Sequence, residues 1–282
     1  MPTSHNVQEA RQALADRLRE LRLDAELTAT ELALRAGWHR TKISKLEHAA
    51  TSPSAEDIRR WCGACGAADQ AADLIASMRA VKSAYIEWRR MERAGLRQLQ
   101  EAAFPLYEQT RFFRIYEPAM VPGLLQTTEY ARALMRSVIA FSGIPDDTEE
   151  AVVARIARQH VLHSGDRRFA VVLEEQALWT RIGSAETMAG QLGHLLRMAA
   201  LPLLSLGIIP RAADRAPMWP VQGFWIFDSS RVHVELPSAQ VKVTQPREVE
   251  VYARTFNELS RMAVYGPAAR ALLTGAIDAL DE

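Results

Sequence analysis

Apolar residues recur at spacings of three and four positions through the first 66 residues, which is the period of helices that each bury one face. The first stripe, residues 7–21, predicts a helix that ends near Ala25. The same periodicity predicts three shorter helices over residues 28–36, 40–48 and 54–65. A series of short helices with one apolar face each is typical of a small all-α domain.

Residues at the predicted helix ends support this division. Thr28 and Glu31 have the spacing of a capping box, in which the threonine accepts from a backbone amide and the glutamate reaches back. Ser54 stands three residues before Asp57 in the same arrangement. Gly37 tolerates the left-handed geometry of a helix end, so it predicts a tight turn between the second and third helices.

From residue 69 to residue 100 the helical pattern continues with heptad-like steps of four and three. The predicted seam consists of Leu74, Met78, Val81, Tyr85 and Trp88. Basic residues outnumber acidic ones here: Arg79, Lys82, Arg89, Arg90, Arg93 and Arg97. We interpret residues 68–100 as a helical linker and candidate dimer seam, whose basic face is either solvated or in contact with DNA backbone.

After Phe104, β-branched and aromatic runs interleave with helical patterns, as in an α+β domain. The predicted strands span residues 111–116, 169–173, 203–209, 224–227, 232–236 and 240–243. The predicted helices span residues 128–141, 149–163, 185–198, 246–264 and 267–280. Because the last three strands have short connections, we expect an antiparallel meander there.

The second and third helices, with the Gly37 turn between them, predict a helix-turn-helix, whose second helix enters the major groove of DNA. Residues 33–45 contain four basic residues and no acidic one, whereas residues 1–75 carry 10 basic and 11 acidic residues. With Ile43 and Leu46 inward, a 100° step per residue centres the outward side on Thr41. The alternative is an ordinary solvated basic face, but the caps, the glycine and the periodicity agree with one another.

This outward side supplies candidate DNA contacts. Four side chains are predicted to reach base edges, where hydrogen bonds distinguish base pairs: Arg40, Thr41, Ser44 and Lys45. Four more are predicted to contact the DNA backbone and position the protein: Thr28, Thr30, His39 and Lys42. Because such domains act in pairs, we expect a homodimer on a pseudo-palindromic operator with half-sites about 34 Å apart, or a multiple.

Two stretches, Leu27–Ala33 and Gly37–Glu47, closely resemble the XRE family of phage-repressor-type DNA-binding domains. The resemblance covers residues 9–67 and implies a five-helix repressor-type fold. This chain departs from the family at two positions. Ala29 stands where the family commonly has a glutamine that contacts DNA, and His39 stands where a small polar cap is usual.

Other motifs resemble those of actinobacterial WhiJ-like regulators, the Scr1-type antitoxin-like group. They are Trp61–Gly66, Glu87–Arg90, Tyr116–Pro118, Val121–Thr127, Gly190–Leu192 and Gly223–Trp225. This resemblance covers nearly the whole chain and implies a C-terminal domain of poorly defined function. It also implies a small BldB-like partner protein. It transfers no catalytic residue.

Composition excludes several classes of protein. With 282 residues, 48% apolar and 24% charged, the chain is typical of folded soluble proteins and not of disordered ones. Its formal net charge is zero, so a nucleic-acid partner is indicated only by local charge placement. Two cysteines and no basic-then-apolar start lead us to expect a cytoplasmic protein. The most apolar stretch, residues 201–210, is half the length of a membrane-spanning helix, so no membrane contact is expected.

Several motifs imitate functional sites but also have ordinary structural explanations. Cys62 and Cys65 imitate a thioredoxin C-x-x-C site, but they lie on an inward helical stripe, so we interpret them as buried structural thiols. Zinc would need a second pair of ligands. His160, His163 and Asp166 could be metal ligands, but a helix end favours a capping role. We expect no metal and no cofactor.

An aromatic group at the C-terminal strands, with Met218, is either core or the lining of an effector pocket: Trp219, Phe224, Trp225 and Phe227. The chain has no phosphate-binding loop and no nucleophile elbow. We therefore assign no catalytic residue and do not expect an enzyme.

The sequence thus predicts a multidomain protein. An all-α five-helix helix-turn-helix domain over residues 1–67 precedes the linker, 68–100, and an α+β interaction or sensing domain over residues 101–282. The predicted function is a sequence-specific DNA-binding transcriptional regulator whose C-terminal domain binds a partner protein or a small-molecule effector. One alternative is an antitoxin-like protein that mainly binds the BldB-like partner, with DNA binding as autoregulation. Another is an enzyme that uses the C-terminal domain.

Overall fold

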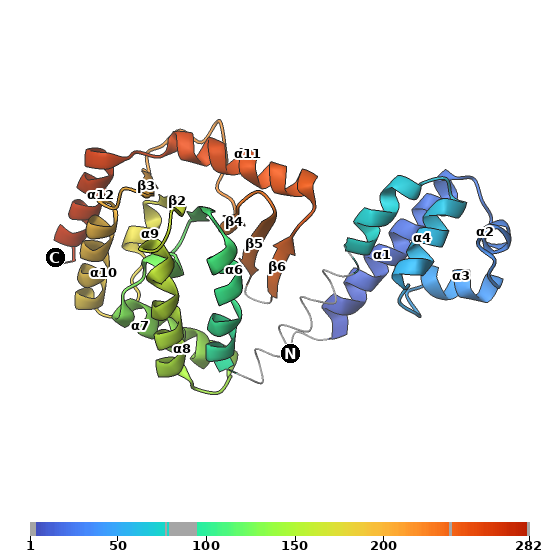
Figure 1. The fold of residues 1–282 in the computed structure, drawn as a ribbon, viewed down its shortest axis with the longest axis horizontal. Coiled ribbons are helices and arrows are strands. Elements are labelled where there is room, and N and C mark those ends of the chain that lie inside the picture. Colours follow the sequence, from blue (N-terminus) through green and yellow to red (C-terminus); the bar gives the residue numbers. More distant parts are fainter. Residues whose placement is uncertain (1–3, 77, 79–94, 237–238, 281–282) are drawn as a thin grey trace. The chain divides into compact units, whose positions relative to one another are not determined.

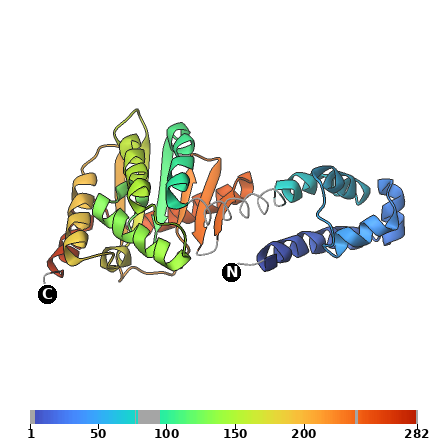
Figure 2. The same cartoon turned by 90° about the horizontal axis from the view of Figure 1, so that it is seen from below.

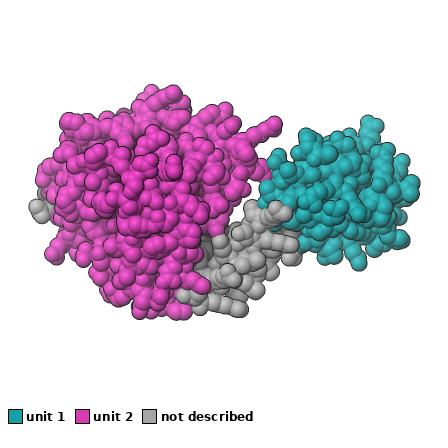
Figure 3. All heavy atoms as spheres, in the orientation of Figure 1, with its two compact units in different colours: residues 1–87 teal, residues 88–282 magenta. Residues whose placement is uncertain are grey.

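The computed structural model describes residues 4–76, 78, 95–236 and 239–280. The chain forms two compact units, residues 1–87 and 88–282 (Figure 3). Each unit has a hydrophobic core of its own. The division between them falls within the segment 68–100, which the sequence predicts to be a linker.

Unit 1 is a cluster of one long helix and several short ones (Figure 1). They are α1 (Ser4–Asp24), α2 (Ala29–Ala36), α3 (Arg40–Glu47) and α4 (Ala55–Ala64), followed by the 3-10 turn η1 (Ala68–Gln70) and a helical stretch over residues 71–76. Thr28 and Ser54 begin α2 and α4 with reciprocal capping boxes, and Gly37 ends α2 with φ at 68°. The predicted all-α fold of this unit is confirmed.

The inward stripes of these helices meet in one core. Its fully buried members are Leu18, Leu32, Ile43, Ile58, Trp61 and Cys62. The indole Nε1 of Trp61 donates to the backbone oxygen of Leu18 at 2.8 Å, so the polar edge of the buried ring is satisfied. This bond and the packing around it tie α4 to α1.

Part of the predicted seam belongs to this core. Leu74 is buried in the core of unit 1, and Met78 packs against it. Val81, Tyr85 and Trp88 lie outside the described residues. The use of this seam as a dimer interface stays a prediction.

Unit 2 is built around a six-stranded mixed sheet in the order β3-β2-β1-β4-β5-β6. The strands are β1 (Phe112–Glu117), β2 (Arg168–Glu174), β3 (Leu204–Ile209), β4 (Phe224–Phe227), β5 (Arg231–Leu236) and β6 (Ala239–Val243). β1, β2 and β3 are parallel, whereas β4 pairs antiparallel with both β1 and β5, and β5 with β6. The predicted meander and the α+β class are confirmed.

The two halves of the sheet differ in their connections. Parallel neighbours need crossovers, which contain α7 (Thr128–Ser142), α8 (Thr148–Ala157) and α10 (Ala185–Met198). The β4–β5 connection is a tight turn at Asp228, where φ is 53°. The carboxylate of Asp228 accepts from the amides of Arg111 and Phe112 at 3.1 and 2.9 Å, so the turn is fixed to the start of β1.

Helices cover both faces of the sheet and give unit 2 three layers (Figure 2). The remaining covering helices are α6 (Phe104–Gln109), α11 (Pro246–Met262) and α12 (Gly266–Asp278). α11 packs on the face that carries Tyr116 and Phe224. The opposite face, with Phe113 and Phe227, packs against α6, α10 and α12. Alternate residues of β1, β2, β3 and β4 therefore belong to two different cores.

The sequence pattern does not predict some elements of the structure. α6 and α9 (Gln176–Trp179) have six and four residues, which is too short for a helical period to show. The helix predicted over residues 149–163 is divided into α8 and the 3-10 helix η3 (Arg158–Leu162). A further 3-10 turn, η2 (Gly123–Leu125), follows the loop after β1.

Gly207 of β3 lies directly beneath the ring of Tyr265. A Cβ at Gly207 would sit 2.6 Å from Cε1 of that ring, whose hydroxyl is held 2.6 Å from Ser260 Oγ. We expect Gly207→Ala to lower the free energy of unfolding by about 1–3 kcal/mol, the cost of overpacking. Urea unfolding of the full chain, monitored by circular dichroism, measures this change in the free energy of unfolding.

In a Tyr265→Ala background the same substitution should cost much less, because the clash is gone. Gly190→Ala is the matched control, since nothing lies within 4 Å of a Cβ there. It replaces an exposed glycine inside α10 and should stabilise the chain by about 0.5–1 kcal/mol. An equal loss with and without the Tyr265 ring would contradict this packing.

Candidate nucleic-acid interface

The first turn of α2 is fixed by its capping box. Glu31 N donates to Thr28 Oγ1 at 3.2 Å, and Thr28 N donates to Glu31 Oε2 at 2.8 Å. Hydrogen bonds from Thr28 lower the pKa of Glu31 below its ordinary value. Thr28 and Thr30 are exposed beside this cap, so both of these residues, which are predicted to contact the DNA backbone, lie at the surface.

α3 begins after an unusual cap, His39. Its Nδ1 accepts from Thr41 N at 3.3 Å and lies 2.8 Å from Thr41 Oγ1. His39 thus replaces the small polar residue that usually satisfies the first amides of a helix. Ile43 and Leu46 are buried on the inward side and hold α3 against the rest of unit 1.

The outward side of α3 is open to solvent. The structure brings all four predicted base contacts together there: Arg40, Thr41, Ser44 and Lys45 are exposed. Among the described residues, neither Arg40 nor Lys45 forms an ion pair. α3 therefore presents two free cations and two hydroxyls on one surface. Contact of these residues with bases stays a prediction.

Lys42, by contrast, is engaged within the protein. Its Nζ forms an ion pair with Asp57 and lies 4.3 Å from the centre of the Trp38 ring. Burial acts to raise the pKa of Asp57, but hydrogen bonds from Lys42 and Ser54 outweigh it and hold that pKa below its ordinary value. The side chain of Lys42 is 41% exposed, so a phosphate would have to compete with Asp57 for it.

A buried ion pair, which the sequence analysis missed, fixes the far end of α3. Arg22 Nε donates to Glu47 Oε1 at 2.6 Å, and Arg22 Nη2 donates to Glu47 Oε2 at 3.2 Å. Arg22 Nη1 also donates to the backbone oxygen of Leu27 at 2.7 Å. This paired geometry constrains direction as well as distance, so it ties α3 to α1. No local pattern marks the pair, because its partners are 25 residues apart.

The two cysteines lie on the inward side of α4 and its end. Cys62 is buried, Cys65 is half-buried, and both thiols are free. Burial raises the pKa of Cys62. Burial and the neighbouring Cys62 raise the pKa of Cys65 to about 11. A redox nucleophile needs a lowered pKa. The interpretation of Cys62 as a buried structural thiol is confirmed, and Cys65 is less buried than expected.

One of the candidate metal ligands of unit 2, His160, has other partners. His160 Nδ1 lies 2.8 Å from the Ala157 oxygen, and its Nε2 contacts Glu108. Within the parts of the chain that the structure describes, no three His, Cys, Asp or Glu residues are grouped to hold a metal ion.

The aromatic pocket considered from the sequence is not formed. Phe224 lies in the core beneath α11, whereas Trp225 and Phe227 lie on the opposite face of the sheet. Trp219 is 68% exposed. That alternative is wrong because neighbouring residues of a strand point to opposite faces.

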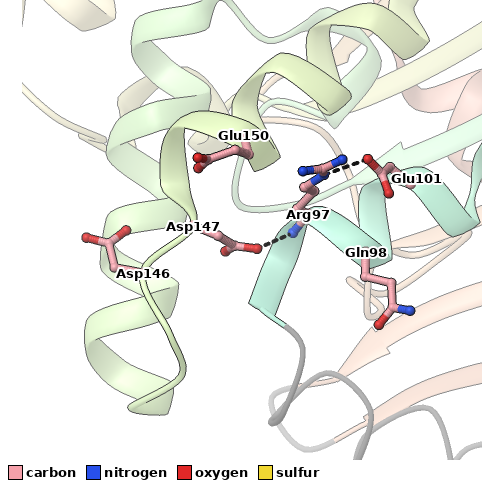
Figure 4. A pocket seen from close by; sticks show the side chains of 6 residues that line it. All are labelled: Arg97, Gln98, Glu101, Asp146, Asp147 and Glu150. Atoms are coloured by element: carbon pink, nitrogen blue, oxygen red, sulfur yellow. Dashed lines mark hydrogen bonds and ion pairs between the residues drawn. The ribbon is translucent and has the colours of Figure 1, made fainter.

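Of the basic linker residues, only Arg97 is described. It pairs with Glu101 at 2.7 Å beside a polar pocket of about 350 Å³ (Figure 4). The carboxylate of Asp147 accepts from the amides of Leu96 and Arg97 at 2.9 and 2.7 Å. Asp147 thus caps the helical stretch described over residues 95–102, which accounts for the polar lining of the pocket.

Comparisons with known proteins agree with this division. A family model described as a helix-turn-helix domain matches residues 13–75. A second, described as a domain of unknown function (DUF5753), matches residues 106–275. No curated protein and no solved structure matches the chain. In the described residues, no helix has the length and apolar character needed to cross a membrane.

Glu47→Gln should weaken unit 1, because it leaves the charge of Arg22 buried without a counter-ion. We expect the local free energy of unfolding to fall by about 3–5 kcal/mol. Hydrogen exchange of peptides from α1 and α3 in the full chain measures this change.

Glu56→Gln is the matched control, since it removes only exposed ion pairs with Arg59 and Arg60. Its effect should stay within about 1 kcal/mol. Equal acceleration of exchange by both substitutions would show that the Arg22–Glu47 pair does not hold α3.

Proposed function

The chain belongs to the DUF5753 family and carries a helix-turn-helix domain, and from this we propose that it is a sequence-specific transcriptional regulator. The observation that carries the proposal is the outward side of α3. There Arg40 and Lys45 are exposed and unpaired among the described residues, with Thr41 and Ser44 between them. Side chains of these types form bidentate or single hydrogen bonds with base edges in the major groove.

Contacts with the DNA backbone would orient the helix-turn-helix domain on the duplex. Thr28 and Thr30 at the start of α2, with His39 and Lys42 at the start of α3, are exposed or half-exposed. Lys42 would exchange its ion pair with Asp57 for a phosphate, which is favoured at low salt because counterions are released. Together these residues would set the register in which α3 meets the bases.

We further propose a homodimer on a pseudo-palindromic operator, because paired half-sites extend the sequence that one short helix can select. The half-sites would lie about 34 Å apart, or a multiple of that distance. The protein would act in the cytoplasm, where its DNA is.

The C-terminal domain would bind a partner protein or an effector, without a catalytic role. The WhiJ-like resemblance suggests a BldB-like partner, and the second candidate function is an antitoxin-like protein in which DNA binding serves autoregulation. One observation favours a protein partner, but on the helix-turn-helix unit and not on the C-terminal domain: Leu34 of α2 is 84% exposed in a groove of about 720 Å³ that Arg35 and Arg60 also line. Co-purification with a tagged BldB-like protein tests this candidate.

Arg40→Ala should weaken binding to the operator by about 1–3 kcal/mol and relax selection at one base pair of each half-site, if Arg40 contacts a guanine. Operators are first selected from random duplexes with the full chain. Fluorescence anisotropy then gives the affinities of both proteins for operator and random DNA.

Arg59→Ala is the matched control, because Arg59 is an exposed arginine of α4 that lies off α3. It should leave base preference unchanged. An equal loss on operator and random DNA would reject base contact by Arg40, and no binding to any duplex at low salt would reject the proposed function.

A further inference from the structure

Leu34 of α2 holds a large apolar side chain in solvent. The residue is 84% exposed, whereas its neighbours Leu32 and Ala33 are buried in the core of unit 1. A single exposed leucine is ordinary on a protein surface. This one lines a groove of about 720 Å³ between the end of α2 and the second half of α4. A concave surface with an apolar side chain is a more specific feature than the exposed side chain alone.

Four other residues that line the groove have no side chain beyond a Cβ: Ala36, Gly37, Gly63 and Ala64. Gly37 is required by the left-handed end of α2. Gly63 has no such reason, because it lies in the last turn of α4, is exposed and has no positive φ. Nothing lies within 4 Å of a Cβ at Gly63. Glycine costs a helix stability relative to alanine, so the packing of this chain does not account for Gly63.

The side chains with charge in this groove are both cations, Arg35 and Arg60, and no acidic residue lines it among the described residues. Arg35 forms no ion pair with a described residue, and its Nη1 donates to the backbone oxygen of Ala64 at 3.4 Å. Arg60 shares the single carboxylate of Glu56 with Arg59, at 3.2 and 3.3 Å. Exposed pairs of this kind are weak. Both arginines are therefore available to a further carboxylate.

These features favour a protein over DNA as the occupant. Phosphates would use the two arginines, but they gain nothing from an exposed leucine or from a surface of small residues. A peptide uses all three, because its backbone comes close where side chains are small and its apolar residues pack on Leu34. The residues predicted to contact bases, Arg40, Thr41, Ser44 and Lys45, do not line the groove.

We propose that this groove is the docking site for an acidic amphipathic segment of a partner protein. A large apolar side chain of the segment packs on Leu34, its backbone passes over Gly63, and carboxylates on either side pair with Arg35 and Arg60. The inference rests on the protein-partner candidate of the proposed function and deepens it by naming the chemistry of the partner. Docking is measured without DNA, so it and DNA binding can fail separately.

The probes are synthetic peptides obtained by display selection. Random peptides are selected on the full chain and counter-selected on Gly63→Gln, whose longer side chain enters the groove without a clash at its Cβ. Peptides that prefer the wild type should carry Asp or Glu on both sides of a large apolar residue. Fluorescence anisotropy then gives their dissociation constants, and circular dichroism shows that each variant is folded.

Leu34→Ser and Gly63→Gln should each weaken a selected peptide by about tenfold or more, because they remove its apolar contact or fill its place. Gly63→Ala should also weaken the peptide, while the chain stays at least as stable as the wild type. Phe141→Ser and Gly190→Gln are the matched controls and should bind like the wild type. Phe141 of α7 is 85% exposed, and nothing lies within 4 Å of a Cβ at Gly190.

Charge is tested by a double-mutant cycle. Arg35→Gln should weaken the peptide by about two- to tenfold and reduce the salt dependence of binding. Replacing the acidic residues of the peptide by their amides should weaken binding to the wild type, and should weaken binding to Arg35→Gln much less. Arg40→Ala should bind the peptide like the wild type, although it is expected to lose operator selectivity.

Several results would overturn the proposal. They are a selection in which no peptide prefers the wild type over Gly63→Gln, preferred peptides without acidic residues, and peptides that bind folded Leu34→Ser unchanged. A loss of operator affinity in Arg35→Gln and Leu34→Ser as large as in Arg40→Ala would assign the groove to DNA. Light scattering in which Leu34→Ser turns a dimer into a monomer would assign it to a second copy of the chain.

Discussion

The buried ion pair between Arg22 and Glu47 is the constraint on which the proposed DNA-binding surface depends. Ile43 and Leu46 hold α3 by its inward side, but apolar contacts alone leave a short helix free to slide or rotate. The two parallel hydrogen bonds from Arg22 remove that freedom at the end of α3, while the His39 cap fixes its start. With both ends fixed, the outward side can keep Arg40 and Lys45 free of ion pairs among the described residues.

The distribution of charge around α3 also keeps its outward side available for DNA. The acidic groups nearest α3 are already satisfied: Glu47 by Arg22, and Asp57 by Lys42. Arg40 and Lys45 therefore face solvent without a competing anion among the described residues. This arrangement gives a locally cationic surface on a chain whose formal net charge is zero.

Local patterns predicted much of this architecture. Caps and glycines located α2 and α3 closely, because helix ends are specified by neighbouring residues. Runs of β-branched and aromatic residues located the six strands of unit 2, because the residues that favour a strand are also neighbours in the sequence. The Arg22–Glu47 pair was missed, because it joins residues far apart in sequence that only tertiary packing brings together. The Lys42–Asp57 pair likewise has no local pattern, although it changes what Lys42 is free to do.

The most direct test of the central claim is methylation interference on a selected operator with the full chain. If α3 enters the major groove, methylation of guanine N7 should block binding at a few positions in each half-site, since N7 is a major-groove acceptor. Unimpaired binding to operators methylated at every guanine N7 would contradict the account, as would interference confined to minor-groove adenine N3.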